Sequence, residues 1–220
     1  MPEAFIEIEA EDGGLDAFLA RPETRSPRPP VLLLADRQGL RPAFQAKSRR
    51  LAAHGYVVLA PDWTARPADE RRDDAEAWFD HLAGDRAVDD ARVGVVGYGA
   101  GADLALQVAA WRAERVAVVG AYLGRGFAPG AAADIAQRIN GIIHLGYAED
   151  RLPGLGLCAL ETALRQSGVD FEAECYPVDP SQDPSLDETH WLRLLDLFAR
   201  TLIRRRPGTA TDATDSSVHR

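Results

Sequence analysis

The chain has 220 residues, of which 46% are hydrophobic and 27% charged, and its formal net charge is −9. This length and apolar content suit one domain with a single sizeable core and exclude a chain that is disordered throughout. The net negative charge, with acidic rather than basic residues clustered, disfavours nucleic acid as a partner. No basic segment precedes an apolar one at the N-terminus, and no run approaches the ~20 apolar residues of a membrane span. We therefore expect a cytoplasmic protein with no membrane partner.

The two cysteines, Cys158 and Cys175, are too few and too far apart in sequence to indicate a disulfide framework or a zinc site. We expect both to be small buried apolar residues in a reducing compartment. The sequence contains no pattern that predicts a metal ion or a cofactor.

Strand and helix signals alternate along the chain, from an N-terminal hairpin to a long C-terminal helix. Apolar alternation or short apolar runs predict strands at residues 5–9, 15–20, 31–35, 56–60, 116–121, 141–146 and 171–176. Apolar residues at helical spacing predict helices at 42–54, 68–82, 102–111, 155–167 and 186–204. This alternation predicts an α/β domain over residues 1–206, with a mostly parallel central sheet of about seven or eight strands and helices on both faces. Residues 207–220 lack apolar periodicity, and we predict a disordered tail.

Residues 92–102 predict a strand, a sharp turn and the start of a helix. In an α/β hydrolase such a turn has the form Gly-x-nucleophile-x-Gly, and its bend lifts the nucleophile above the carboxyl edge of the sheet. Here Gly97, Gly99 and Gly101 fill the pattern, so glycine holds the nucleophile position. Glycine has no side chain that can attack a substrate.

Two other interpretations of these glycines exist. The spacing Gly97-x-Gly99-x-x-Ala102 also satisfies a loose dinucleotide-binding fingerprint. That fingerprint needs an acidic residue at the end of the following strand, which here ends in residues 120–122, Gly-Ala-Tyr, so a nucleotide site is disfavoured. Alternatively, the glycines only permit close packing and the positive φ of a sharp bend, with no ligand.

Three motifs in order resemble those of the dienelactone hydrolase family. Residues 94–101, Gly-Val-Val-Gly-Tyr-Gly-Ala-Gly, resemble that family's Gly-Leu-Val-Gly-Tyr-Cys-Leu-Gly elbow. Residues 61–66 resemble its Pro-Asp-Leu-Tyr-Ala-Arg motif, and residues 144–149 resemble its His-Met-Gly-Gly-Gln-Asp motif. The resemblance covers about residues 3–203. It implies a small α/β-hydrolase fold and a nominal hydrolase of small ester or lactone carbonyls, with a Cys-Asp-His triad.

The resemblance assigns the three triad positions to residues that depart from the family. The nucleophilic cysteine falls on Gly99 and the histidine on Ser181, so both positions are vacant. The acid falls on Glu149, with Asp150 as the alternative, and a glutamate can replace aspartate in such a triad.

The remaining site residues also follow from the resemblance. We expect the oxyanion hole to consist of the backbone N–H groups of Ala100 and Gln38, which survive side-chain changes. Arg66 matches the arginine that binds substrate carboxylate in the family, and we place Arg37 and Tyr98 in the same substrate-binding group. The family's glutamate after the third strand corresponds to Asp36 or Arg37.

Two of the five histidines are candidates for the site. His144 lies within an apolar strand and is interpreted as a core histidine, whereas His190 is interpreted as a helix cap or a surface residue. With two triad positions vacant, we expect weak or altered hydrolase activity on a small carbonyl or carboxylate ligand. The alternative is a non-catalytic protein, monomer or homodimer, that binds such a ligand or a partner in the same cleft.

Overall fold

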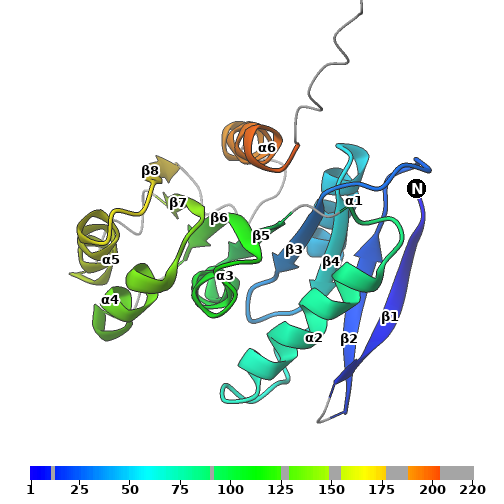
Figure 1. Ribbon diagram of the computed structural model, residues 1–220, viewed down its shortest axis with the longest axis horizontal. Helices are drawn as coiled ribbons and strands as arrows, with labels where there is room; N and C mark the ends of the chain where they lie inside the picture. The colour runs from blue at the N-terminus through cyan, green and yellow to red at the C-terminus, as the bar shows by residue number, and fades with distance from the viewer. Residues whose placement is uncertain (11–12, 90–91, 125–128, 149–154, 177–187, 204–220) are drawn as a thin grey trace, which may run out of the picture.

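The structure is a computed structural model that describes residues 1–10, 13–89, 92–124, 129–148, 155–176 and 188–203 (Figure 1). Strands and helices alternate through these residues as predicted. The strands are β1 (Glu3–Ala10), β2 (Gly13–Ala20), β3 (Pro30–Leu34), β4 (Val57–Pro61), β5 (Val93–Tyr98), β6 (Val116–Leu123), β7 (Ile142–Ala148) and β8 (Phe171–Tyr176). The helices are α1 (Pro42–Ala53), α2 (Arg71–Gly84), α3 (Ala100–Trp111), α4 (Pro129–Arg138), α5 (Leu155–Gln166) and α6 (Glu188–Leu202).

The described strands form one sheet in the order β1-β2-β4-β3-β5-β6-β7-β8. β1 pairs antiparallel with β2 and β2 antiparallel with β4, and all other pairs are parallel. The predicted mostly parallel sheet, with an N-terminal hairpin at its edge, is therefore confirmed. Because the parallel strands share a direction, the carboxyl ends of β3, β4, β5, β6, β7 and β8 lie at one edge of the sheet, where α/β proteins bind ligands.

Helices cover both faces of this sheet (Figure 1). Phe44 of α1 and Trp191 of α6 belong to a buried cluster on one face, with other residues of both helices. Trp78 of α2, Leu104 of α3 and Leu160 of α5 belong to the cluster on the opposite face. β3 and β4 are buried at every residue, as the continuous apolar runs predict for strands covered on both sides.

Some element boundaries differ from the prediction. α3 begins at Ala100, two residues earlier than expected, because the turn at Gly99 is itself the start of the helix. α2 begins only at Arg71, after Glu70 at its N-cap position. α4 was not predicted, since a helix that buries mainly small side chains such as Ala132 and Ala136 has a weak apolar signal.

The expectation for the two cysteines is wrong, because both are exposed. Cys175 lies on β8, the strand at the far edge of the sheet, and Cys158 lies on the outer part of α5. Among the described residues, no helix is both long and apolar enough to cross a membrane. The predicted tail at 207–220 lies outside the described residues.

Candidate active site

The glycine turn between β5 and α3 has the geometry of a strand-to-helix elbow. Gly99 has φ 56° and ψ −120°, a backbone conformation that residues with side chains rarely adopt. Its N–H donates to the carbonyl oxygen of Tyr122 on β6 at 2.8 Å, and its own carbonyl accepts the N–H of Ala102 at 3.1 Å. The neighbouring strand and the first turn of α3 therefore hold the bend from both sides.

The glycines on either side of Gly99 are required by close backbone approach. A Cβ atom at Gly97 would lie 2.1 Å from the carbonyl oxygen of Gly101, and one at Gly101 would lie 2.2 Å from that of Leu34. At Gly99 the only described atom within 4 Å of such a Cβ is the Cβ of Asp36, at 3.3 Å. The elbow thus excludes side chains at its flanks and leaves space for one at its apex, where the sequence has none.

Asp36, in the loop after β3, lies beside this space and organises its own loop. Its Oδ1 accepts a hydrogen bond from the N–H of Gln38 at 2.9 Å, and its Oδ2 accepts one from Nη2 of Arg41 at 2.6 Å. In this conformation the Gln38 N–H, predicted to be an oxyanion-hole donor, is directed to Asp36 instead. The N–H of Ala100 opens α3, where helix geometry supplies no intrahelical acceptor and the helix dipole favours negative charge. Ala100 is therefore the better placed of the two predicted donors.

Arg66, predicted to bind a substrate carboxylate, pairs with α2. Its Nε and Nη2 donate to the two carboxylate oxygens of Asp74, each at 3.0 Å, and Nη2 also lies 2.9 Å from Oε2 of Glu70. The Asp74 side chain is only 2% exposed, so this bidentate pair ties the segment after β4 to the helix. The planar fork that would grip a ligand carboxylate is occupied by a protein carboxylate.

We predict that Arg66→Ala lowers the free energy of unfolding by about 3 kcal/mol, because the buried Asp74 carboxylate loses its partner. Chemical denaturation measures this loss. Arg138→Ala, which removes an exposed i,i+4 pair with Asp134, is the control and should cost about 0.5 kcal/mol or less. A variant Arg66→Ala that keeps its stability but loses ligand affinity would contradict the structural role and favour substrate binding.

The assignment of Tyr98 to the substrate-binding group is wrong. Tyr98 is fully buried, its ring stacks on that of Tyr122 with centroids 5.0 Å apart, and Nζ of Lys47 lies 4.5 Å from its centroid. Successive strand side chains point to opposite faces, so Tyr98 points into the α1 and α6 core while the glycines beside it face α3. Burial raises the pKa of its hydroxyl above the usual value.

Asp103, in the first turn of α3, is a titratable group near the elbow that the sequence did not single out. Burial raises its pKa to about 6, against the opposing effect of the Arg37 guanidinium. Arg37 is exposed on the loop after β3, at the carboxyl edge where it was expected. An acidic residue in the first turn of a helix is routine, so the sequence contains no signal for this shift.

Replacing Asp103 by asparagine should stabilise the protein at pH 7. Because its pKa is higher in the folded than in the unfolded state, the folded protein binds more protons and wild-type stability falls between about pH 4 and pH 6. Asp103→Asn should lack this fall and gain about 1 to 2 kcal/mol at pH 7 after allowance for partial exposure, with little gain at pH 4. Denaturant unfolding at both pH values measures this gain in the free energy of unfolding, with the exposed Asp196→Asn as the control. An equal gain at both pH values would exclude Asp103 as the titrating group.

His144 and His190, two of the five histidines, are both buried. Nε2 of His144 lies 2.9 Å from the hydroxyl of Tyr176, which in turn donates to Glu174, and burial lowers the pKa of His144. This confirms the interpretation of His144 as a core histidine. The interpretation of His190 as a capping or surface residue is wrong: it lies 1% exposed among aromatic rings, 5.2 Å from the centroid of Tyr122. A single polar residue at the start of an amphipathic helix gave no sign of this burial.

The other predicted triad positions lie outside the described residues. Glu149 and Asp150 directly follow the last residue of β7, and Ser181 follows the end of β8 by five residues in sequence. Their assignments remain predictions. Within the ranges that the structure describes, no group of three or more His, Cys, Asp or Glu side chains could hold a metal ion.

Comparisons with known proteins agree with the fold and the motifs. The model of the dienelactone hydrolase family matches residues 15–86 and 63–202. Comparison with curated proteins gives no match. A dienelactone hydrolase-like promiscuous phosphotriesterase from metagenomic libraries is 20% identical, with a TM-score of 0.73 over 92% of this chain and 100% of its own.

Two further solved structures have the same fold. The dienelactone hydrolase of Anabaena variabilis is 18% identical, with a TM-score of 0.70 over 91% of this chain and 98% of its own. An acylaminoacyl peptidase of Pyrococcus horikoshii is 13% identical, with a TM-score of 0.68 over 94% of this chain but only 43% of its own. At these identities the structures show the α/β-hydrolase fold alone. The family match spans most of the chain, and the protein therefore belongs to the dienelactone hydrolase family.

Proposed function

We propose that this family member hydrolyses small ester or lactone substrates weakly, by a route without a covalent intermediate. Membership of the family supports hydrolase function. The observation that carries the rest of the proposal is Gly99, which holds the elbow conformation but supplies no nucleophile. Among the described atoms, only the Cβ of Asp36 lies within 4 Å of a Cβ added there. A non-covalent route follows, because no side chain at the apex can form an acyl-enzyme.

The expected rate follows from what remains. Enzymes that lose triad members keep about 10³- to 10⁴-fold acceleration over water, from the oxyanion hole and substrate binding. Here the N–H of Ala100 would stabilise the developing oxyanion, and Arg37 would attract an anionic substrate. Glu149 would activate the attacking water, since it is the one triad position whose residue keeps a carboxylate.

The experiment compares turnover of p-nitrophenyl acetate, dienelactone and an aryl phosphotriester by the wild type and by Glu149→Gln. The phosphotriester is included because one structural relative is named as a promiscuous phosphotriesterase. We expect slow ester or lactone turnover that Glu149→Gln abolishes and that the exposed control Glu172→Gln leaves unchanged. Turnover that Glu149→Gln does not affect would exclude Glu149 as the base.

A non-catalytic binding function is the second candidate, because two contacts weaken the catalytic site that the family pattern predicts. The Gln38 N–H is directed to Asp36, and the Arg66 guanidinium is directed to Asp74. Two of the groups that the family pattern assigns to the substrate are thus engaged within the protein. Saturable binding of a carboxylate ligand with no turnover of any of the three substrates would favour this candidate.

A further inference from the structure

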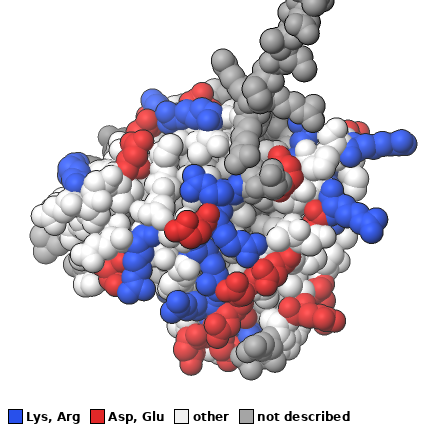
Figure 2. All heavy atoms as spheres, in the orientation of Figure 1, with Lys and Arg blue, Asp and Glu red and all other residues white. Residues whose placement is uncertain are grey.

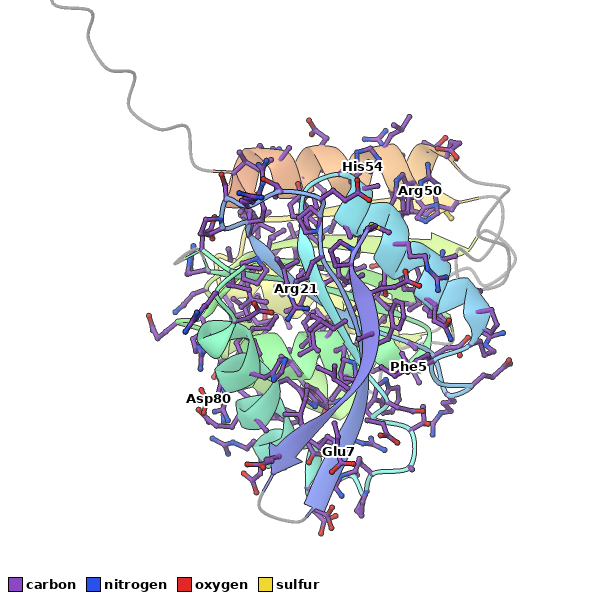
Figure 3. The ribbon with its side chains drawn as sticks, turned by 90° about the vertical axis from the view of Figure 1, so that its right-hand side faces the viewer. Phe5, Glu7, Arg21, Arg50, His54 and Asp80 are labelled. Carbon is purple, nitrogen blue, oxygen red and sulfur yellow. The ribbon has the colours of Figure 1, made fainter. Side chains whose placement is uncertain are left out.

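The edge of the sheet formed by β1 lies far in sequence from the elbow. β1 is an edge strand of eight residues that no other described strand flanks on its outer side (Figure 3). Its register with β2 runs without a bulge and it contains no proline. Bulges, prolines and short length are common means by which proteins block such edges.

The hydrogen-bond pattern shows which residues face outward. Pro2 lies opposite Arg21 in the register, and its carbonyl accepts the Arg21 N–H at 2.9 Å. Opposed residues of an antiparallel pair alternate between hydrogen-bonded and non-hydrogen-bonded positions. The residues of β1 at non-hydrogen-bonded positions, whose N–H and C=O point away from β2, are therefore Glu3, Phe5, Glu7 and Glu9.

The neighbouring strand gives an independent check of this alternation. Asp16 lies opposite Glu7, so the same rule turns the backbone of Asp16 away from β1. Its carbonyl indeed accepts the N–H of Asp62, which follows β4, at 2.7 Å. The outer edge of β1 at Glu7 thus presents backbone donors and acceptors to whatever lies beside it.

A hollow of about 750 Å³ runs along this edge. It is lined by four consecutive residues of β1, 7–10, and by one side of α2. The hollow therefore follows the second half of β1, between this strand and α2. An added strand would pair beside β1 along this hollow, with α2 over one of its faces.

The acidic side chains around the hollow are its only described charged groups with a fixed sign, and His81 is the one other titratable residue of its lining. Its described lining contains six carboxylates and no lysine or arginine, and Figure 2 shows acidic side chains gathered over the part of the molecule that contains α2. Asp74, Glu76 and Asp80 are paired with arginines outside the hollow. The exposed carboxylates of Glu7, Glu9 and Asp73 have no ion pair with a described residue, and Figure 3 shows Glu7 on β1 and Asp80 on α2 flanking this region.

We propose that the β1 edge groove, formed by residues 7–10 and α2, binds an extended, lysine- or arginine-rich segment of a partner protein as an added strand. Backbone hydrogen bonds to Glu7 and Glu9 would hold the segment in register, and basic side chains would meet the carboxylates. Phe5, 66% exposed on the same edge, offers an apolar contact beyond the groove. Pairing with a second copy is disfavoured, because it would bring the glutamates of two β1 strands together.

The test uses the full chain and a fluorescent ten-residue peptide of alternating lysine and valine, whose lysines lie on one face when it is extended. Fluorescence anisotropy should show saturable binding that weakens with salt. Glu7→Pro should weaken it at least tenfold, because proline removes the outward N–H while the ladder to β2 does not use it. Glu7→Ala keeps that N–H and should weaken binding only a few-fold. A peptide of alternating glutamate and valine should not bind.

A second variant keeps the test decisive if proline disturbs the fold, which the melting temperature reports. Glu7→Lys with Glu9→Lys leaves the backbone unchanged and should abolish binding. Equal affinity for wild type and a folded Glu7→Pro variant, or no saturable binding at low salt, would overturn the proposal. Two other outcomes would replace the partner protein as the occupant. Dimerisation that Glu7→Pro abolishes would assign the edge to a second copy. Tighter peptide binding after replacement of Arg204, Arg205 and Arg206 by serine would assign it to the chain's own C-terminal segment.

Discussion

Gly97→Ala is expected to lower the free energy of unfolding by about 4 kcal/mol or more, a large part of the roughly 5 to 15 kcal/mol that stabilises an ordinary domain. The added methyl carbon would lie 2.1 Å from the carbonyl oxygen of Gly101 and 2.7 Å from the Cα of Ala102. Both are backbone atoms of α3, so no side-chain rotation relieves the clash. The helix would have to move off the sheet, and thermal or denaturant unfolding measures the loss.

Gly130→Ala is the matched control for this loss. Gly130 lies in α4, and nothing described is within 4 Å of its added Cβ, whereas Gly97 lies in β5 against the backbone of α3. Alanine there should stabilise the protein by about 0.5 to 1 kcal/mol, because it reduces the freedom of the unfolded chain. If both variants have the stability of the wild type, α3 does not pack on the elbow as closely as the structure describes.

The fold follows from patterns that the sequence states locally. Apolar runs such as 31–35 and 56–60 predict buried strands because a strand covered on both faces must be apolar at every position. The glycine spacing at 97, 99 and 101 predicts the elbow, because only glycine permits the close approach of strand and helix at Gly97 and Gly101. Such signals depend on neighbours in the chain, which a sequence displays directly.

Much of the site depends instead on contacts between distant segments. The pairing of Arg66 with Asp74 and of the Gln38 N–H with Asp36 is set by how loops fold back, and a residue's type does not reveal whether its partner is a ligand or the protein. Tyr98 holds a motif position next to the nucleophile position, but strand alternation turns its side chain into the core. Family motifs therefore locate the site more reliably than they assign its individual side chains.

The combined variant Gly99→Cys with Ser181→His should gain esterase activity, about 10²- to 10⁴-fold above that of Gly99→Ala with Ser181→His. The elbow conformation is already present, and the Cβ of Asp36, at 3.3 Å, is the only described atom within 4 Å of a Cβ added at the apex. A cysteine at this φ costs about 1 to 3 kcal/mol of backbone strain. The hydrogen bond from the N–H of residue 99 to Tyr122 and the packing of α3 must offset this cost. Initial rates with p-nitrophenyl acetate measure the gain.

The alanine variant is the control because it introduces the same Cβ and the same backbone strain without a thiol, so any rate difference belongs to the nucleophile. A second readout is intact mass: a covalent route adds one acetyl group to the cysteine variant, which hydroxylamine removes, whereas direct attack by water adds none. If the cysteine variant folds and is acetylated but does not turn over, the nucleophile position is right and Ser181 does not correspond to the histidine. If it folds and is never acetylated, the space at Gly99 is not the nucleophile position of this family.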